Sequence, residues 1–325
     1  MSLSNSRLEV MKHLEKSMDD FLEKFLKPVE EIWQPTELLP VTTGPQFISE
    51  VQEIRELARD LDDELLTVLI GDAITEEALP TYEAWLMDVE GVNQRNPTGW
   101  SQWIRAWTAE ENRHGDLLNK YLYLSGRVNM REVEISTQYL LRDGLDIQTT
   151  KDPYRNFVYT SFQELATNLS HRRVALLARK TSNLQLAKMC GFIASDELRH
   201  ASAYKHFVSR IFEIDPSEMM LAFEDMMRKK IVMPAHFLRE SGGKIGELFA
   251  HFSDTAQRTM VYTAQDYIDI LNSLIKEWKI EEMRDLNEKA EKARDYVLNL
   301  PARLLRISER MVLPETPYQF KWIAK

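Results

Sequence analysis

The sequence contains very little cysteine and glycine. Cys190 is the single cysteine among 325 residues, which excludes an internal disulfide and any zinc or iron–sulfur site built from several thiolates. Glycine occupies 11 positions, about half of the usual ~7%. A chain so poor in glycine has few tight turns, and we expect long helices instead.

Long apolar runs and an excess of basic charge are also missing. No apolar stretch approaches the ~18 residues that a membrane-spanning helix needs. Lys and Arg number 41 against 51 Asp and Glu, a net charge of −10, which argues against a general nucleic-acid-binding protein. The first residues resemble neither a signal peptide nor an organelle transit peptide. We expect a cytoplasmic location, or the plastid stroma if a transit peptide has been removed.

Helical periodicity dominates the rest of the chain and predicts an all-α fold with a large core, since 44% of the residues are hydrophobic. We expect one domain over residues 1–325, with an N-terminal helix and loop over 1–45, a bundle core over about 46–212 and C-terminal helices over about 216–325. The expected helices cover residues 8–26, 47–59, 62–89, 98–124, 130–142, 153–180, 183–212, 255–278, 280–299 and 302–311, and another begins at 216. Pro80 removes one backbone hydrogen bond inside the third of these, and we expect a bend there.

Two of the predicted helices carry the same short pattern. Residues 110–114 read Glu-Glu-Asn-Arg-His and residues 196–200 read Asp-Glu-Leu-Arg-His. Residues three apart share one face of a helix, so the second acid and the histidine of each motif point the same way. Helical bundles that hold two iron or manganese ions use two such pairs, with one further Glu from each of two other helices.

Glu76 and Glu164 lie on two other long helices, in the chain order that such a centre requires. Four carboxylates and two imidazoles suit iron or manganese better than copper. The pattern therefore predicts a two-metal centre with these six ligands: Glu76, Glu111, His114, Glu164, Glu197 and His200.

Three acids near these residues have an expected role as well. A metal-bound histidine usually donates its free ring N–H to a carboxylate. Glu110 and Asp196 each adjoin a predicted ligand, and each could reach the histidine of the opposite motif. Asp72 lies one helical turn before Glu76 and is a further candidate for this outer layer.

Several longer stretches closely resemble the soluble acyl–acyl-carrier-protein desaturases: residues 74–82, 107–116, 119–122, 159–164 and 226–230. The likeness runs from about residue 27 to the C-terminus. It implies a ferritin-like di-iron carboxylate bundle with additional helices, two Fe ions per chain and a homodimer. It also implies O2-dependent desaturation of a saturated fatty acyl chain on acyl carrier protein, with two electrons from a ferredoxin-like donor. By position, the iron ligands of that family fall on the same six residues.

The resemblance gives roles to two more residues and marks one departure. Trp33 matches a tryptophan on the family's electron path with Asp196 and His114, although it could simply anchor a loop. Thr167 matches a threonine beside the oxygen pocket, and its hydroxyl could equally bond a carbonyl of its own helix. Trp85 is bulkier than the side chains common at its position, so the acyl tunnel and chain-length preference are in doubt.

The electron and acyl donors are both expected to be separate proteins. No Gly-x-Gly-x-x-Gly motif is present, so we expect no flavin or NAD site, and electrons would come from an external ferredoxin. Acyl carrier proteins are acidic, so docking requires a local basic patch. The densest basic cluster consists of Arg228, Lys229 and Lys230. The second candidate is the pair Arg172 and Arg173. Cations at the end of a helix could instead complement its dipole.

Two other functions use similar ligands. A ferritin-like di-iron hydroxylase would need the same six residues, and only its product would distinguish it. An iron-storage protein is the non-enzymatic alternative, although the C-terminal helices have no obvious use there. The double-bond position and the acyl chain length do not follow from the sequence.

Overall fold

The computed structural model describes residues 5–324. Within that range there are thirteen α-helices, four short 3₁₀ turns and no β-strand, so the all-α prediction is confirmed. The α-helices are α1 (Asn5–Glu15), α2 (Met18–Phe25), α3 (Phe47–Arg59), α4 (Asp63–Glu77), α5 (Leu79–Met87), α6 (Trp100–Ser125), α7 (Met130–Asp143), α8 (Pro153–Lys180), α9 (Leu184–Ile214), α10 (Pro216–Lys229), α11 (Phe249–Arg258), α12 (Ala264–Glu277) and α13 (Glu288–Ser308). The 3₁₀ turns are η1 (Val29–Glu31), η2 (Pro35–Glu37), η3 (Pro234–Phe237) and η4 (Ile280–Glu282). None of the described helices has the length and apolar character needed to cross a membrane.

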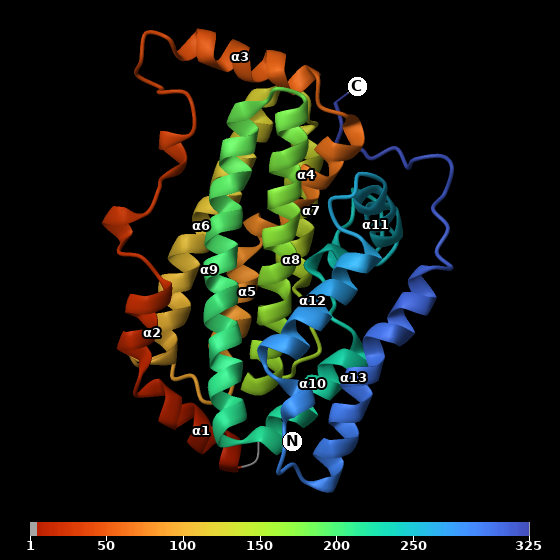
Figure 1. Ribbon diagram of the computed structural model, residues 1–325. Coiled ribbons are helices and arrows are strands. Elements are labelled where there is room, and N and C mark those ends of the chain that lie inside the picture. The colour runs from red at the N-terminus through yellow and green to blue at the C-terminus, as the bar shows by residue number, and fades with distance from the viewer. Residues whose placement is uncertain (1–4, 325) are drawn as a thin grey trace.

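Helices α6, α8 and α9 run side by side with α4 and α5 through the centre of the molecule (Figure 1). α8 and α9 contain 28 and 31 residues, so each is about 40 Å long or longer. Side chains cap the start of both helices: Asp152 accepts from the backbone N–H of Tyr154, and Asn183 from that of Leu186. These two helices form the most extensive pair in the fold and carry half of the predicted ligands.

The other helices surround this bundle. α1 and α2 pack against α9, α3 lies across one end, and α10, α12 and α13 cover the α8 side (Figure 1). One part of the interior is filled by aromatic rings, where Trp103 meets Phe207 edge to face at 5.0 Å between centroids. Trp100 and Tyr204 are fully buried in the same cluster.

The prediction of a bend at Pro80 was wrong, because the helix ends there instead. α4 stops at Glu77, and α5 begins at Leu79. Pro80 is the second residue of α5, where a missing N–H costs nothing because no helical acceptor precedes it. Glu76 therefore lies in the last turn of α4, directly before the change in chain direction.

Other helix boundaries also differ from the prediction. The first expected helix divides at Ser17 into α1 and α2, and residues 255–278 divide between α11 and α12, where Met260 has a φ of 59°. In place of the helices expected over 280–299 and 302–311, the chain forms the 3₁₀ turn η4 and then the single helix α13, which contains Pro301. Its start is set by Asn287, whose side chain accepts from the N–H of Ala290 at 3.0 Å.

Gly115 lets α6 approach α4 closely beside the predicted ligands. A Cβ atom at this position would lie 2.9 Å from the backbone nitrogen of Glu77 and 3.0 Å from the carbonyl carbon of Glu76. Any larger residue at position 115 would therefore push the end of α4 outward.

Candidate metal centre

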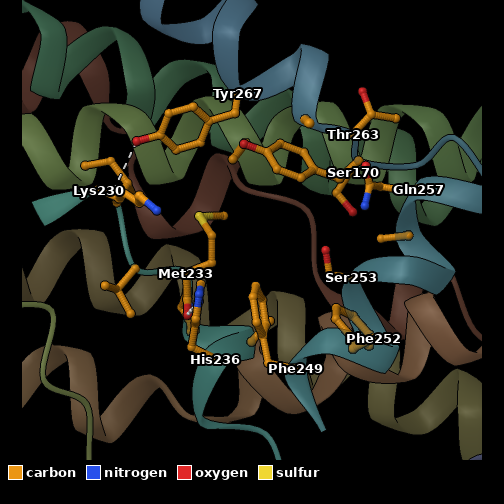
Figure 2. A pocket seen from close by; sticks show the side chains of 18 of the residues that line it. Ser170, Lys230, Met233, His236, Phe249, Phe252, Ser253, Gln257, Thr263 and Tyr267 are labelled. Carbon is orange, nitrogen blue, oxygen red and sulfur yellow. Dashed lines mark hydrogen bonds between the residues drawn. The ribbon is translucent and has the colours of Figure 1, made fainter. Parts of the chain in front are cut away.

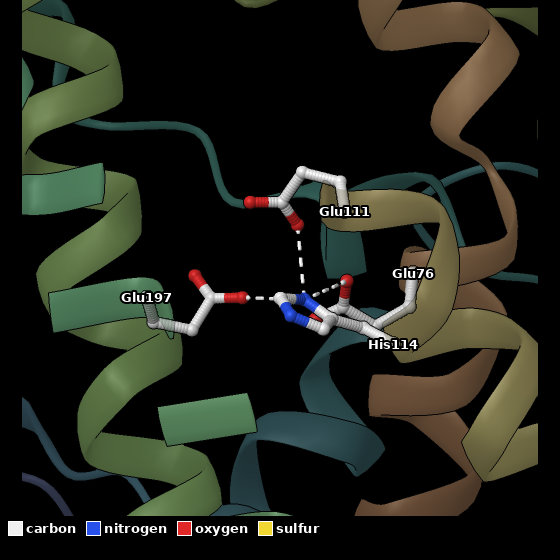
Figure 3. Close-up of side chains that lie close together, drawn as sticks. All are labelled: Glu76, Glu111, His114 and Glu197. Atoms are coloured by element: carbon white, nitrogen blue, oxygen red, sulfur yellow. Dashed lines mark ion pairs between the residues drawn. The ribbon is translucent and has the colours of Figure 1, made fainter. Parts of the chain in front are cut away.

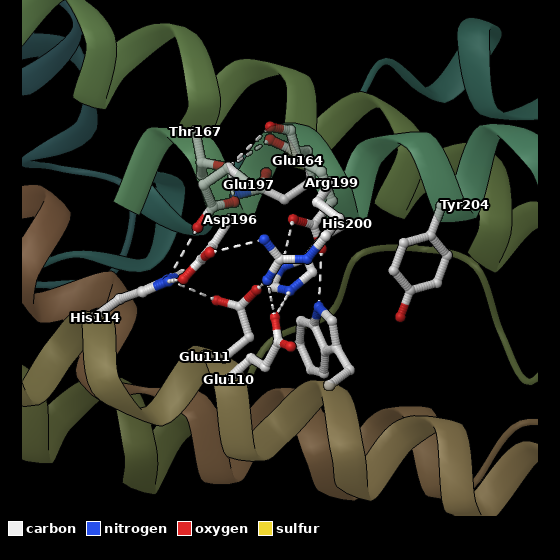
Figure 4. Close-up of polar contacts among 12 residues, drawn as sticks. Glu110, Glu111, His114, Glu164, Thr167, Asp196, Glu197, Arg199, His200 and Tyr204 are labelled. Atoms are coloured by element: carbon white, nitrogen blue, oxygen red, sulfur yellow. Dashed lines mark hydrogen bonds and ion pairs between the residues drawn. The ribbon is translucent and has the colours of Figure 1, made fainter. Parts of the chain in front are cut away.

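The structure brings all six predicted ligands together inside the bundle. Glu76 comes from α4. Glu164 comes from α8 and the two Glu–His pairs from α6 and α9 (Figure 4). Five of the six residues are buried, and both histidines are completely inaccessible. The helical spacing thus places the carboxylates and imidazoles of four segments at one point in the core.

Four of the residues form one group around His114. Its Nδ1 atom lies 3.1 Å from Oε2 of Glu111, 3.1 Å from Oε1 of Glu197 and 3.7 Å from Oε2 of Glu76 (Figure 3). All the candidate ligand atoms of this group lie within 4.8 Å of one another.

The second group is arranged around His200. Nδ1 of His200 lies 2.5 Å from Oε1 of Glu111 and 3.7 Å from Oε2 of Glu164. Glu111 belongs to both groups and offers one oxygen to each. A carboxylate between two groups of ligands is the arrangement expected for a pair of metal ions that share one bridging residue.

The outer ring nitrogens of both histidines face carboxylates on the opposite helix. Nε2 of His200 lies 2.9 Å from Oε2 of Glu110, and Nε2 of His114 lies 3.4 Å from Oδ2 of Asp196 (Figure 4). A carboxylate can only accept, so the ring proton of each histidine lies on Nε2. Nδ1 is then the ring nitrogen that faces the carboxylates inside the cluster.

The polar atoms at the centre lack hydrogen-bond partners. Five of the buried atoms without a hydrogen bond belong to this cluster: Glu111 Oε1, His114 Nδ1, Glu164 Oε2, Glu197 Oε1 and His200 Nδ1. Lone pairs that converge in a buried site repel one another unless a proton or a cation lies between them. Four carboxylates also match the charge of two divalent cations. The donor set therefore fits a two-metal centre.

Burial and mutual interaction shift the pKa values of the cluster in opposite directions. Burial raises the pKa of Glu164 well above its ordinary value, and the charges of Glu197 and Glu111 raise it further. Burial also opposes ionisation of Glu111, but His114 and His200 outweigh it and hold the pKa of Glu111 below its usual range. The two histidines therefore keep the shared carboxylate in its charged form.

Arginines surround the outer carboxylates. Asp196 accepts from Nη2 of Arg113 at 2.8 Å and from Nη1 of Arg199 at 2.9 Å. Burial would raise the pKa of Asp196, but His114 and these two arginines hold it well below its ordinary value. Glu110 likewise pairs with Arg199 as well as with its histidine.

Trp33 lies against this layer. Its indole ring stacks on the imidazole of His114 with centroids 6.0 Å apart and planes inclined by 12°. Its Nε1–H donates to Oδ2 of Asp196 at 2.9 Å, and the guanidinium of Arg113 covers its ring. The structure therefore brings Trp33, Asp196 and His114 into direct contact, and the role of Trp33 on an electron path stays a prediction.

Thr167 is placed beside two of the predicted ligands. Its hydroxyl lies 3.2 Å from the backbone carbonyl of Glu164 and within hydrogen-bonding distance of Oε2 of Glu197. The geometry is therefore compatible with both roles predicted for Thr167, a hydroxyl group beside the metal ligands and a hydrogen bond to a carbonyl of its own helix. Asp72 is less direct: it accepts from Ser170 at 2.9 Å, and burial raises its pKa to about 6.

The sequence analysis missed a buried histidine of the site. His171 on α8 is 1% exposed, and its Nε2 atom lies 3.1 Å from Oε1 of Glu76. It follows Glu164 by seven residues, two helical turns along the same face, which is the one signal that could have found it. Glu76 thus also has an outer partner that can orient it.

The predicted docking residues have varied surroundings. Arg228 pairs with Glu224 at 2.6 Å, and Lys229 pairs with Asp225 at 2.7 Å. Lys230 is exposed at the edge of a large cavity. Arg172 is exposed, whereas Arg173 is bonded to Asp266 and to backbone carbonyls of residues 260 and 261. Their role in docking stays a prediction.

Two adjoining cavities lead to the cluster. The larger, of about 540 Å³, lies between α4, α8 and the C-terminal helices, and apolar side chains such as Met233, Phe249 and Phe252 line much of it (Figure 2). The smaller, of about 60 Å³, borders the carboxylates of Glu76, Glu111, Glu164 and Glu197. Thr75, Gln163 and Thr167 line both cavities. The two cavities therefore adjoin at these three side chains, beside the predicted metal ligands.

Comparison with known proteins supports the resemblance noted in the sequence. Residues 6–324 match the fatty acid desaturase family. Stearoyl-[acyl-carrier-protein] 9-desaturase 1 of Arabidopsis thaliana is 51% identical over 312 residues, which cover 95% of this chain and 79% of the plant protein. The chloroplastic stearoyl-[acyl-carrier-protein] 9-desaturase of Spinacia oleracea is 49% identical over 99% of this chain and 82% of its own length.

A solved structure supports the fold. DesA2 of Mycobacterium tuberculosis, a candidate acyl-ACP desaturase, superposes with a TM-score of 0.52 over 90% of this chain and 99% of its own. Its sequence identity is 20%, so this likeness concerns the ferritin-like helical fold alone. The family match and the plant relatives together cover nearly every residue from the first helix to the last. This chain therefore belongs to the fatty acid desaturase family.

Proposed function

We propose that this protein is an acyl-[acyl-carrier-protein] desaturase with a di-iron centre. It would convert one CH2–CH2 unit of a saturated acyl chain to a cis CH=CH unit, with O2 taking up the two hydrogens, two electrons and two protons to give two molecules of water. The observation that carries the proposal is the set of six converging ligands at the end of an apolar cavity. The plant relatives, named as stearoyl-carrier-protein desaturases, support the substrate class.

The six ligands would hold two iron ions per chain, and Glu111 belongs to both ligand groups. Oxygen-rich ligands with two imidazoles suit iron. When bound, iron supplies the activation of O2 that removal of hydrogen from an unactivated methylene requires. The protein contributes binding, orientation and exclusion of water.

The remaining contributions come from side chains around the cluster. The narrow cavity beside Glu164 and Thr167 holds the acyl chain and limits the water that can enter. The hydroxyl of Thr167 lies within hydrogen-bonding distance of Oε2 of Glu197 and would be a donor beside the place where O2 is activated. Trp33 would carry electrons inward, because its ring stacks on the imidazole of His114.

Three partners belong to this proposal. An acyl carrier protein would dock near the basic residues 228–230, of which Lys230 lies at the rim of the larger cavity. A ferredoxin-like protein would deliver electrons, and a second copy of the chain would complete a homodimer.

The test is product analysis. The iron-loaded protein is incubated with saturated acyl-carrier protein, O2 and reduced ferredoxin, and the acyl products are analysed by mass spectrometry. We expect a monounsaturated product two hydrogens lighter than the substrate, and none from Glu164→Ala. The exposed pair of Glu9 with Lys12 offers a control, Glu9→Ala, which should keep full activity. A hydroxylated product would replace desaturation with hydroxylation, and iron uptake far above two per chain without product would favour storage.

A further inference from the structure

Trp107 on α6 is a buried side chain in direct contact with the predicted metal centre. Its Nε1–H donates to Oε1 of Glu164 at 3.2 Å, and the residue is 6% exposed. Its ring also meets the imidazole of His200 edge to face, with centroids 6.3 Å apart. Trp107 precedes Glu111 by four residues, so it lies on the face of α6 that carries the predicted ligands. One indole therefore contacts a candidate ligand from each of two other helices.

The side chain of Glu164 depends on this contact. Within residues 5–324, the bond from Trp107 is the one hydrogen bond that its carboxylate makes, and no arginine pairs with it. A buried carboxylate without a donor is costly, so the indole N–H stabilises the charged form of Glu164. Because the indole holds Oε1, the other oxygen is turned inward, and Oε2 lies 3.7 Å from Nδ1 of His200. The contact thus decides which oxygen of Glu164 faces the centre of the cluster.

The other ligand group has the same geometry with a different donor. Oε1 of Glu76 lies 3.1 Å from Nε2 of His171, and Oε2 of Glu76 lies 3.7 Å from Nδ1 of His114. In both groups a ring nitrogen holds the outer carboxylate oxygen, and the inner oxygen faces a candidate histidine ligand. An imidazole nitrogen donates or accepts according to its tautomer, whereas an indole N–H can only donate. The bond from Trp107 to Glu164 therefore has one possible direction.

We propose that Trp107 is a positioning residue for one of the two metal positions: its indole N–H fixes Oε1 of Glu164 and presents Oε2 to the metal. This role rests on the di-iron function proposed above. Glu164 belongs to the group of His200 and not to that of His114, so the effect concerns one metal position. A neutral donor orients the carboxylate without offsetting its negative charge, which stays available to a cation.

A packing role for the indole is the alternative, and two substitutions separate the two roles. Trp107→Phe keeps a six-membered aromatic ring but removes the N–H. Trp107→His has a smaller ring, and its Nε2 atom lies two bonds from Cγ, as Nε1 does in tryptophan. If packing alone mattered, the phenylalanine variant would be the better substitute because it fills more of the space. If the hydrogen bond to Glu164 matters, the histidine variant is the better one.

The experiment measures iron binding without substrate. Each metal-free protein is titrated with Fe²⁺ against a coloured chelator, and the iron-loaded forms are compared by Mössbauer spectroscopy. In Trp107→Phe we expect one of the two irons to bind roughly 10–100-fold more weakly, as is usual when a partner of a ligand is lost, while the other binds as in wild type. The spectrum should change for one iron. Trp107→His should lose less affinity than Trp107→Phe.

Trp103 provides a matched control on the same helix. It is 1% exposed, and its Nε1–H donates at 3.3 Å to the hydroxyl of Tyr204, which is not a predicted ligand. Trp103→Phe should lower the thermal stability, which is measured for every variant, and leave both iron affinities unchanged.

Two results would overturn the proposal. The first is a Trp107→Phe variant that binds both irons as tightly as Trp103→Phe does, with the same Mössbauer spectrum. The second is a Trp107→His variant that binds iron more weakly than Trp107→Phe. Because the titration needs no acyl substrate, absence of an unsaturated product in the separate assay would refute the desaturase function while the iron affinities still decide the role of Trp107.

Discussion

Glu110 on α6 and His200 on α9 are joined across the bundle by a contact of 2.9 Å between Oε2 and Nε2. Asp196 on α9 and His114 on α6 repeat the relationship in the opposite direction. Each helix therefore carries a candidate metal ligand together with the acid that orients the ligand of its partner. A change at either acid acts on the other helix.

Loss of Glu110 should weaken iron binding without removing a ligand. In Glu110→Ala, His200 loses the acceptor that fixes its proton on Nε2, and we expect a 10–100-fold lower affinity for Fe²⁺. Competition with a coloured chelator measures this affinity. Asp116 is an exposed acid on the same helix, paired with Lys120 at 2.7 Å, so Asp116→Ala is the control. Equal affinities in the two variants would show that the contact does not orient the ligand.

Glu111 should be the residue on which both metal positions depend. Because it belongs to both ligand groups, Glu111→Ala is expected to reduce iron from about two per chain to near zero. Glu76 belongs to one group, so Glu76→Ala should retain roughly one iron per chain. Elemental analysis of purified protein checks both values. Two irons retained in Glu111→Ala would exclude a bridging position for this carboxylate.

His171 should act on the metal centre through Glu76. We expect His171→Phe to lower iron affinity 10–100-fold and to alter the Mössbauer spectrum of the iron-loaded protein. His171→Gln keeps a side-chain donor and should restore most of the affinity. A packing role alone predicts a fall in thermal stability with an unchanged spectrum, so the spectrum decides between the two.

Lys230 should contribute to encounter with an acidic carrier protein. In the double variant Arg228→Glu with Lys230→Glu, we expect a several-fold higher KM for acyl-carrier protein and a weaker dependence on salt, with unchanged kcat. Exposed charges are screened over ~8 Å at physiological ionic strength, so they affect association more than chemistry. Arg172→Glu tests the second site separately. A KM that stays constant across ionic strengths would remove residues 228–230 from the docking surface.

The bond between Arg173 and Asp266 should stabilise the fold in a pH-dependent way. Burial would raise the pKa of Asp266, but its bonds to Arg173 and Thr263 outweigh burial and hold the pKa below its ordinary value. A lowered pKa means that the contribution is present above about pH 4 and is lost as the pH falls through the folded-state value. Asp266→Asn should cost about 2 kcal/mol at neutral pH, less than a fully buried pair because Arg173 is partly exposed. Thermal unfolding of both proteins should show this difference disappearing as the pH falls below the lowered pKa of Asp266, where the wild-type carboxylate is protonated.

The sequence predicted the all-α class and the positions at which the six candidate ligands meet. Those positions depend on local geometry, since a helix places residues three apart on one face whatever lies around it. The cross-helix contacts of Glu110 and Asp196 followed from the same spacing and the ordinary behaviour of a ligating histidine.

Features that depend on contacts between distant segments were not predictable. Thr98 was expected to begin α6, yet the helix starts at Trp100, whose N–H is accepted by Glu15 from α1 at 3.2 Å. A cap supplied from 85 positions away leaves no local pattern. His171 escaped notice for a similar reason, because its partner Glu76 comes from another helix. Pro80 did mark an interruption, but whether it bends or ends the helix depends on the packing of α4 and α5.

Gly115 is not a predicted ligand, but it affects the position of the predicted ligand Glu76. Its lack of a side chain determines how near α4 can come to α6, and Glu76 is fixed to the backbone that a methyl group would touch. Because position 115 carries only a hydrogen atom, the two ligand-bearing helices can pack at a short distance from each other. The 3.7 Å distance between Oε2 of Glu76 and Nδ1 of His114 therefore depends on the packing of these helices as well as on the two side chains.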